Sequence, residues 1–505
     1  RPTVRGMAAE VEEGLRGGGV EVGAADEIEA VERGGELPLS FAQQRLWLAE
    51  QLEVSSPLYN VPAAIRLTGA LDADALEQSL NEIVRRHEAL RTSFATVKGR
   101  PVQVVVPAQG LKIPKIDLSG LGKAEREAEA LSLARKEAQR PFDLSQPQLL
   151  RVTLVRLAED EHVVLLTMHH IVSDGWSLGV LVREVGALYE SYSHNLPVTL
   201  PELPIQYADF AVWQRAWLEG AAGARQLAYW KKQLAGAPDM LPLPTDYPRP
   251  PAQSFRGTVE TFTLAPALRD TLKAFSLKEG ATLFMTLLSA FDALLYLYTK
   301  QETILVGTDI ANRNRGELEK LIGFFVNQLV LRADMSGNPT FRELLRRVTE
   351  VSLGAYAHQD MPFDKLVEEL NPKRDLNRPV LFQVKMVFQN APIPPLKLSR
   401  LELAPLEIAP QTAKYDLLLE VGEAEEGLRG AMHYRTELFD AKTIARMLKH
   451  YEAILRHASG NADVHLHELE EVLRVADEQE RATEEKDYAQ ARLSKLKNIK
   501  RRVVV

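Results

Sequence analysis

The clearest pattern of apolar positions in the chain is a short run that ends in two histidines. Residues 163–168 are almost all apolar, which is typical of a fully buried strand. His169 and His170 follow, and residues 173–175 are of types that favour a turn. Ser177 is a candidate N-cap for a helix beyond this turn. The apolar residues of that helix share one face: Leu178, Leu181, Val182, Val185 and Leu188. We therefore predict a strand, a turn and a helix, with both histidines where the strand leaves the core.

Helical and strand patterns alternate in both halves of the chain. In the first half we expect a strand over 63–67 and a helix capped by Asp72 or Asp74. In the second half, Thr282 is the expected cap of a strongly apolar helix. The proline-rich segment 236–253 interrupts the periodicity and is the expected connector. Further elements are expected at 38–52, 304–306 and 444–458. The pattern predicts an α/β (α+β) fold.

Composition favours a soluble globular protein. The 505 residues, 45% of them hydrophobic, are enough for two sizeable cores. A net charge of -8 provides no basic surface of the kind that nucleic-acid binding needs, so we expect no nucleic-acid partner. No apolar run reaches the length of a membrane span, so we expect no membrane contact. The absence of cysteine excludes disulfides and thiolate catalysis and is compatible with the cytoplasm, the expected location.

The spacing of the two histidines argues against a metal site. Side chains alternate across a strand, so His169 and His170 are expected to point to opposite sides of the sheet. A metal-binding helix instead brings two histidines at i and i+4 to one ion. The remaining alternatives are core histidines bonded to the backbone and one histidine that faces a cavity. We expect no metal.

The residues around the histidines carry a family resemblance. The sequence His-His-x-x-x-Asp-Gly, followed by Trp176 and Ser177, resembles the signature of condensation domains of nonribosomal peptide synthetases. These domains are relatives of chloramphenicol acetyltransferase and of the acyl-CoA-dependent acyltransferases. Other segments resemble further motifs of that family, in the family's order: 40–47, 86–94, 141–144, 207–215, 322–329, 358–366 and 374–390. Two positions depart from the family pattern, Pro147 and the order of residues 377–380. The resemblance extends over about residues 37–465.

The resemblance implies both an architecture and a set of partners. The fold would be two chloramphenicol-acetyltransferase-like lobes, arranged as a V-shaped pseudodimer with a central tunnel. His170 would lie near the middle of the tunnel, with Trp176, Ser177 and Asn327 as candidate lining residues. An upstream donor carrier domain and a downstream acceptor carrier domain would each extend a phosphopantetheine arm to this histidine. Neighbouring synthetase domains are further expected partners. The chain needs no cofactor of its own, because the carriers deliver the substrates.

His169, Asp174 and Arg91 are assigned to maintaining the motif. An aspartate at a buried turn needs a partner, since an unpaired buried carboxylate is too costly to remain charged. By resemblance, an arginine holds the motif aspartate. We therefore expect an ion pair between Asp174 and Arg91, with a solvated Arg91 as the alternative.

The implied reaction is amide-bond formation by attack of a carrier-bound amine on an acyl or peptidyl thioester. An α-amino group has a pKa near roughly 8, so a neutral imidazole can remove or steer its proton, and His170 is the candidate. The backbone N–H of Gly175 is the candidate donor to the tetrahedral oxyanion. Because thioesters are already activated, alignment can provide much of the rate, and His170 then positions rather than abstracts.

The organisation expected along the chain has six parts. Residues 1–14 are a possible end of an upstream carrier domain, and 15–36 are a flexible linker. The N-terminal lobe spans 37–235, the connector 236–253, and the C-terminal lobe 254–470. Residues 471–505 are expected to form a charged linker to a downstream domain, with apolar spacing that permits a helix.

The finer assignment is a domain of the LCL type, which joins an L-configured donor to an L-amino-acid acceptor. The sequence Ser-Asp-Gly-Trp-Ser at 173–177 resembles that subtype. Two rival functions stay open. One is a catalytically silent condensation fold that recruits partners, and the other is an acyltransferase to a soluble amine or alcohol.

Overall fold

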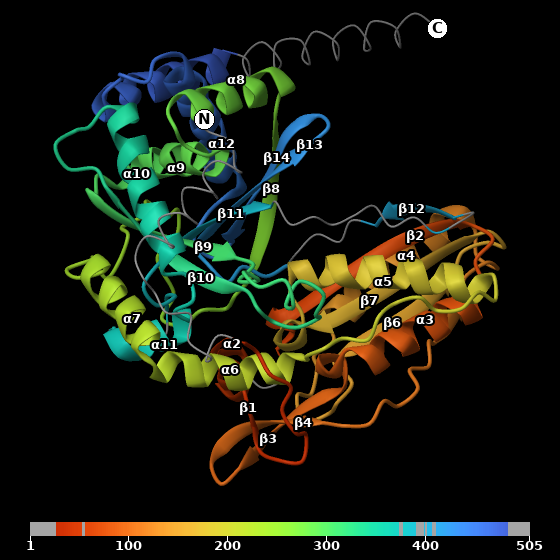
Figure 1. The fold of residues 1–505 in the computed structure, drawn as a ribbon. Helices are drawn as coiled ribbons and strands as arrows, with labels where there is room; N and C mark the ends of the chain where they lie inside the picture. The colour runs from red at the N-terminus through yellow and green to blue at the C-terminus, as the bar shows by residue number, and fades with distance from the viewer. Residues whose placement is uncertain are drawn as a thin grey trace, which may run out of the picture.

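The computed structural model describes residues 27–52, 56–372, 377–389, 398, 401–406 and 411–482. The predicted carrier end at 1–14 lies outside these residues, as does most of the predicted downstream linker. Two α/β halves diverge like the arms of a V, each with its own sheet and its own helices (Figure 1). The predicted mixed α/β architecture is therefore confirmed.

The first half is built on a five-stranded sheet of order β12-β2-β7-β6-β5. Its strands are β2 (Asn60–Gly69), β5 (Lys115–Asp117), β6 (Leu150–Arg156), β7 (Glu161–His169) and β12 (Leu401–Pro405). Its helices are α3 (Ala73–Arg86), α4 (Lys123–Gln139) and α5 (Gly175–Ser193). All neighbouring strands are antiparallel except β5 and β6.

Residues 163–168 of β7 are almost all apolar because both faces of the sheet are covered. Val163 and Leu165 pack with residues of α4, whereas Val164 and Met168 pack with residues of α3 and α5. This alternation is what a strand dictates, and it places successive side chains of β7 in two different cores. The strand predicted over 163–168 is confirmed and ends at His169.

The second half is built on a six-stranded sheet of order β10-β9-β11-β13-β14-β8. Its strands are β8 (Gly257–Leu264), β9 (Thr303–Ile310), β10 (Asn327–Asp334), β11 (Val384–Gln389), β13 (Leu417–Ala424) and β14 (Gly427–Arg435). Its helices are α8 (Pro266–Lys278), α9 (Leu283–Thr299), α10 (Phe341–Ala357) and α12 (Ala441–Gly460). Strand β11 runs parallel to both of its neighbours, and the other pairs are antiparallel.

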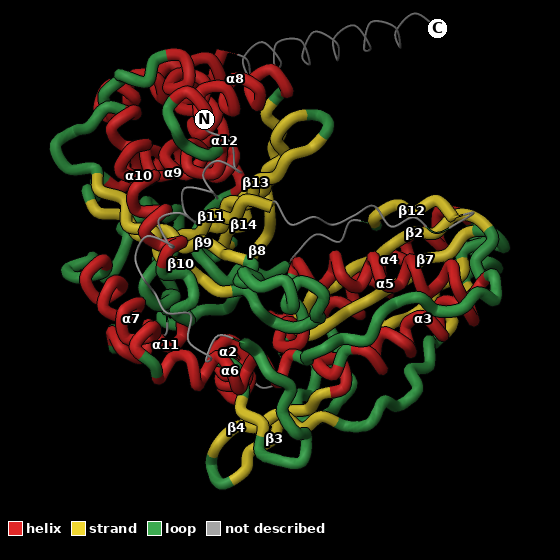
Figure 2. Tube along the Cα trace, in the orientation of Figure 1, coloured by secondary structure: helices red, strands yellow, loops and turns green. Residues whose placement is uncertain are grey.

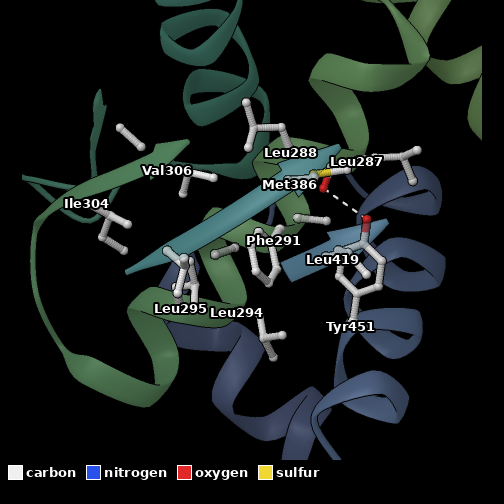
Figure 3. Close-up of a cluster of buried hydrophobic side chains, with 14 of the residues drawn as sticks. Leu287, Leu288, Phe291, Leu294, Leu295, Ile304, Val306, Met386, Leu419 and Tyr451 are labelled. Carbon is white, nitrogen blue, oxygen red and sulfur yellow. Dashed lines mark hydrogen bonds between the residues drawn. The ribbon is translucent and has the colours of Figure 1, made fainter. Parts of the chain in front are cut away.

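Helix α9 forms the centre of the second core. Its side chains meet those of β9, β11 and β13 on one side and Tyr451 of α12 on another (Figure 3). The Tyr451 hydroxyl donates to the Leu287 carbonyl at 3.1 Å.

Among the described residues no single helix has the length and apolar character of a membrane span; α8 and α9 meet those limits only as a pair bent by 101°.

A small sheet and four helices lie beside the two main sheets (Figure 2). The small sheet has the order β1-β4-β3, and its strands are β1 (Leu37–Pro38), β3 (Thr92–Val97) and β4 (Arg100–Val105). The helices are α2 (Phe41–Leu52), α6 (Tyr207–Glu219), α7 (Ala221–Gln233) and α11 (Phe363–Leu370). Helix α2 of the first half contacts α11 of the second, so these elements join the two arms.

Segments of the second half cross into the first. Strand β12 adds to the first sheet by pairing antiparallel with β2 (Figure 1). Residues 318–325 also contribute five side chains to the first core. The boundary between 37–235 and 254–470 stays a prediction, and these crossings show that the two sheets and cores share segments from both ranges.

The predicted linker regions differ from each other. Over the described part of 15–36, Ile28 is buried and Arg33 pairs with Glu88 and Asp209, both at 2.7 Å, so this part is packed rather than flexible. The connector 236–253 has no helix or strand, as expected, although Leu241 is buried in the second core. At the other end, residues 469–482 are helical.

The helix caps follow local sequence. Asp72 caps α3 by accepting from the N–H groups of residues 74 and 75, and Thr282 caps α9, as predicted. The prediction for α5 is wrong by three residues, because Asp174 rather than Ser177 is its N-cap. The Asp174 carboxylate accepts from the Ser177 N–H at 2.8 Å, a bond that ends the turn and starts the helix.

Candidate functional site

His170 is the first residue after β7 and opens a short 3₁₀ turn, η3 (His170–Val172). Its Nδ1 lies 2.7 Å from the Ser173 carbonyl oxygen. A carbonyl oxygen only accepts, so Nδ1 carries the proton and the lone pair of the neutral ring is on Nε2. The ring packs against Phe324, with 4.6 Å between the ring centroids. The turn and this contact fix the tautomer and the direction of the imidazole.

A cavity of about 480 Å³ lies between the two halves, and His170 is part of its wall. The first half contributes Arg45 of α2 and Tyr59 of η1 (Pro57–Tyr59) to the wall. The second half contributes residues of β9, β10, β11, β13 and β14, including Asp309, Gln328, Lys385, Glu420 and His433. Of the residues expected along a tunnel, only His170 is in contact with this cavity.

The other candidate lining residues make different contacts. Trp176 donates its Nε1 hydrogen to the Glu319 carbonyl at 2.9 Å, and Asn327 donates to the Gln359 and Met361 carbonyls. Both side chains tie loops together instead of facing the cavity. Ser177 is fully buried.

Asp174 is fully buried and is the centre of a network that joins the halves. Its carboxylate accepts from the N–H and Oγ of Ser177, from the Phe325 N–H at 2.9 Å, and from Arg313 Nη2 at 3.1 Å. Ser177 Oγ also accepts from the Gly323 N–H at 3.1 Å and lies 2.8 Å from the Gly323 carbonyl oxygen. Three donors and a paired guanidinium together offset the cost of burying this carboxylate.

The predicted pair of Asp174 with Arg91 is wrong, because Arg313 occupies that position. Arg91 instead lies 3.6 Å from Glu88 and donates to the Val106 carbonyl within its own half. Arg313 reaches Asp174 from the loop after β9, 139 residues away in sequence. The run Asn312–Arg315 precedes the motif-like segment at 322–329, but nothing local in it signals a contact with Asp174.

His169 is almost completely buried, with 1% of its surface exposed. Its Nδ1 accepts the Ile171 N–H at 3.1 Å, and its ring meets the edge of Phe142. Burial lowers the pKa of His169 to about 3, and the neighbouring His170 adds to this. The two histidines therefore have separate surroundings, and His169 packs in the interior beside the turn.

Burial also lowers the pKa of His170, to about 4, with the positive charge of Lys414 as the next cause. The bond to Ser173 and the charge of Asp174 act in the opposite direction. The imidazole is thus neutral at physiological pH, with its Nε2 lone pair available. Its conjugate acid is strong, so the ring can relay a proton but holds one only briefly.

Gly175 is the first residue of α5 and is exposed. A Cβ placed on it would meet no atom within 4 Å, so a substrate can approach the backbone closely. Its N–H belongs to the first turn of a helix, where donors have no intrahelical partner and the dipole favours negative charge.

Three cationic side chains contact the cavity, and no pattern in the sequence indicated them there. Arg45 donates to Gln328 at 2.9 Å and lies 3.6 Å from Asp364. Lys385 pairs with Asp309 at 2.7 Å. Lys414 lies over the ring of Tyr59. Among the described residues, no group of three or more histidine, aspartate or glutamate side chains is placed to hold a metal ion.

Two α/β halves with a histidine on the wall of the cavity between them fit the chloramphenicol-acetyltransferase-like fold, which the similar solved structures share. Within that fold class, residues 33–480 match the Condensation domain family, and the chain belongs to this family. Condensation domains of nonribosomal peptide synthetases are acyltransferases that form amide bonds.

The chain is also similar to individual proteins and solved structures. It is 49% identical over 436 residues to a linear gramicidin synthase of Brevibacillus parabrevis, covering 86% of this chain and 6% of that protein. The X-domain in its complex with OxyB from teicoplanin biosynthesis has a TM-score of 0.79 and 27% identity, covering 88% and 97% of the two chains. The first condensation domain of the calcium-dependent antibiotic synthetase, in complex with a substrate analogue, has a TM-score of 0.71 and 21% identity, covering 86% and 99%. The chain thus spans less than a tenth of the gramicidin synthase that it matches.

Proposed function

We propose that this chain forms an amide bond between two carrier-bound substrates: the amine of an aminoacyl thioester attacks an upstream acyl or peptidyl thioester. The observation that carries the proposal is His170, whose Nε2 lone pair is held at the wall of a cavity between the halves. Membership of the condensation family supports the same reaction.

The reaction balances without any further reactant. The neutral amine attacks the thioester carbonyl carbon, so that a C–N bond forms and the carbonyl oxygen becomes an oxyanion. When the C–S bond breaks, the phosphopantetheine sulfur leaves as a thiol with one proton, and the amide nitrogen has lost one. His170 Nε2 accepts this proton from nitrogen and returns it to sulfur, or it orients the amine by a hydrogen bond. A pKa of about 4 favours orientation and a brief relay.

The remaining motif residues have separate roles in this proposal. The Gly175 N–H, exposed at the start of α5, donates to the oxyanion. His169 and Asp174 hold the strand end and the turn in place. Arg313 takes the role expected of Arg91, because it neutralises Asp174 and ties that turn to the second half.

The substrate type and the partners follow from the resemblance. The motif at 173–177 supports an LCL-type reaction between an L-configured donor and an L-amino acid. An upstream donor carrier and a downstream acceptor carrier deliver the substrates on phosphopantetheine arms, so the chain needs no cofactor of its own. A cytoplasmic location stays a prediction.

Recruitment of partners without catalysis is the second candidate function. The observation that favours it is the likeness to the X-domain, which was solved in complex with OxyB. The placement of His170 argues against it, because an unused imidazole needs neither a fixed tautomer nor access to a cavity. Acyl transfer to a soluble amine or alcohol is the third candidate.

One assay separates the three functions. Donor and acceptor carriers are loaded with acyl and aminoacyl groups, the chain is added, and intact carriers are weighed by mass spectrometry. We expect product on the acceptor carrier, whereas product in solution indicates transfer to a small molecule and no product indicates recruitment. His170→Ala should lower the rate by about 100-fold or more with the fold intact. His194→Ala, on the surface after α5, is the matched control. A near wild-type rate for His170→Ala would refute the assignment.

A further inference from the structure

Lys414 is the one cation on the cavity wall, among the residues the structure describes, that has no anionic partner. Arg45 lies beside Asp364 and Lys385 beside Asp309, at 3.6 and 2.7 Å. Lys414 has no ion pair and no hydrogen bond within the described residues, and its Nζ lies 4.4 Å from the centroid of the Tyr59 ring. The ring face is favourable for an ammonium but does not replace a counterion.

The surroundings of Lys414 further disfavour its positive charge. Burial and, after it, the charges of Lys385 and Arg45 lower the pKa of Lys414 to about 7, while Asp309 acts in the opposite direction. The carboxylate of Asp309 is already engaged by Lys385. Glu420, also on the wall, pairs with His433 at 3.2 Å. Asp309 and Glu420 therefore have other partners, and neither forms an ion pair with Lys414 among the described residues.

The position of Lys414 connects it with the reacting group. It lies in the turn before β13, on the second half, and shares the cavity with His170 of the first half. Its charge is the second largest cause of the lowered pKa of His170. A substrate that reaches His170 through this cavity therefore comes within the field of this cation.

Building on the proposed amide-bond formation, we propose that Lys414 binds a negatively charged oxygen of the carrier-bound substrate. Two oxygens have this chemistry. One is a carboxylate on the side chain of the donor or acceptor residue. The other is the oxyanion that the thioester carbonyl becomes when the amine attacks. Either oxygen supplies a counterion for Lys414, and the resulting charge-assisted bond is strong in a partly desolvated site.

Lys414→Met and Lys414→Arg test the proposal, with Lys98→Met as a matched control on an exposed lysine. Binding is measured by calorimetry with two non-hydrolysable pantetheine amides, one aspartyl and one asparaginyl, which differ in a single charge. Transfer is measured between loaded carriers with aspartyl and asparaginyl acceptors. Lys414→Met should not lower the temperature of unfolding, because it removes a buried charge with no anionic partner among the described residues. Thermal melting thus separates loss of function from loss of fold.

The two sources predict different results. If the oxygen is a side-chain carboxylate, the wild type binds the aspartyl probe about 10- to 100-fold more tightly than the asparaginyl probe, and Lys414→Met loses this preference. If it is the oxyanion, neither probe is preferred, and Lys414→Met slows transfer to both acceptors by about 10- to 100-fold while Lys414→Arg restores part of the rate. Unchanged binding and unchanged transfer in Lys414→Met would overturn the proposal. Absence of transfer by the wild type counts against amide-bond formation instead, and the binding comparison then decides on Lys414 alone.

Discussion

Replacing Arg313 by methionine is expected to lower the free energy of unfolding by about 3–5 kcal/mol. Arg313 and Asp174 are 1% and 0% exposed at their side chains, so the substitution leaves a carboxylate without its counterion in the interior. Breaking one partner of a buried ion pair costs about that much. Arg313 also donates to the Leu321 carbonyl at 2.8 Å, and this oxygen loses its partner as well. Methionine keeps much of the packing against Phe325, so the loss reports on charge rather than volume.

The matched variant is Arg91→Met, at the residue that the sequence pointed to. Arg91 is 19% exposed at its side chain and lies 3.6 Å from Glu88, three residues earlier in the chain. Pairs of this kind contribute little, so we expect a loss of about 1 kcal/mol or less. The two variants remove the same functional group, and each arginine also donates to a backbone carbonyl, but only Arg313 contacts Asp174.

The measurement is urea unfolding followed by far-UV circular dichroism and tryptophan fluorescence. A cycle with Asp174→Asn, alone and combined with Arg313→Met, isolates the interaction of the pair. We expect the double variant to be less destabilised than the sum of the singles, because both charges are then gone. An equal or larger effect of Arg91→Met, or a coupling energy near zero, would refute the role assigned to Arg313.

Two further predictions follow from buried titratable side chains, and a third follows from close packing at a glycine. Because burial lowers the pKa of His170 to about 4, its ring protons should show no titration by NMR between pH 5.5 and 8. Its contribution to stability is lost only as pH falls from the pKa of the unfolded state, about 6.5, toward 4. An NMR midpoint near 6.5 would contradict this. Burial raises the pKa of Asp292 well above its usual value, so Asp292 binds a proton when the protein folds, and the protein loses stability as pH rises past about 3.9. Asp292→Asn should therefore raise the melting temperature more at pH 8 than at pH 5. An equal rise at both pH values would contradict the raised pKa. A Cβ on Gly307 would lie 2.1 Å from the Phe382 ring, so Gly307→Ala should cost about 1–3 kcal/mol in urea unfolding, whereas Gly316→Ala, with open space around it, should cost far less.

Short-range sequence patterns predicted the strand, turn and helix that position His170 and Gly175. The apolar run before His169, the turn residues that follow it and the cap at Asp72 all act within a few positions of the chain. Their outcome is set by side-chain alternation and capping, which depend little on distant contacts. The one local error, Ser177 as the cap of α5, arose because Asp174 and Ser177 are both suitable caps, and only the contacts of Asp174 decide between them.

Contacts between distant segments could not be predicted in the same way. Arg313 and Arg91 are equally plausible partners of a buried aspartate when only charge is considered. The choice depends on the loop after β9, which carries Arg313 to α5. The crossing of β12 into the first sheet has the same origin, because pairing with β2 joins residues more than 300 positions apart.

The site residues that the sequence predicted lie on the first half, whereas the lysines that it did not predict lie on the second half. His170 and Gly175 belong to one strand, turn and helix, so their geometry is a local property that a sequence motif can specify. Lys385 and Lys414 lie on the opposite wall, and they share a cavity with His170 only because the second half folds against the first. If both proposals hold, the first half provides the group common to the reaction, and the second half provides charges that distinguish one substrate from another. Substitutions on the second wall should therefore change which substrates react while leaving the tautomer of His170, fixed by Ser173, unaltered.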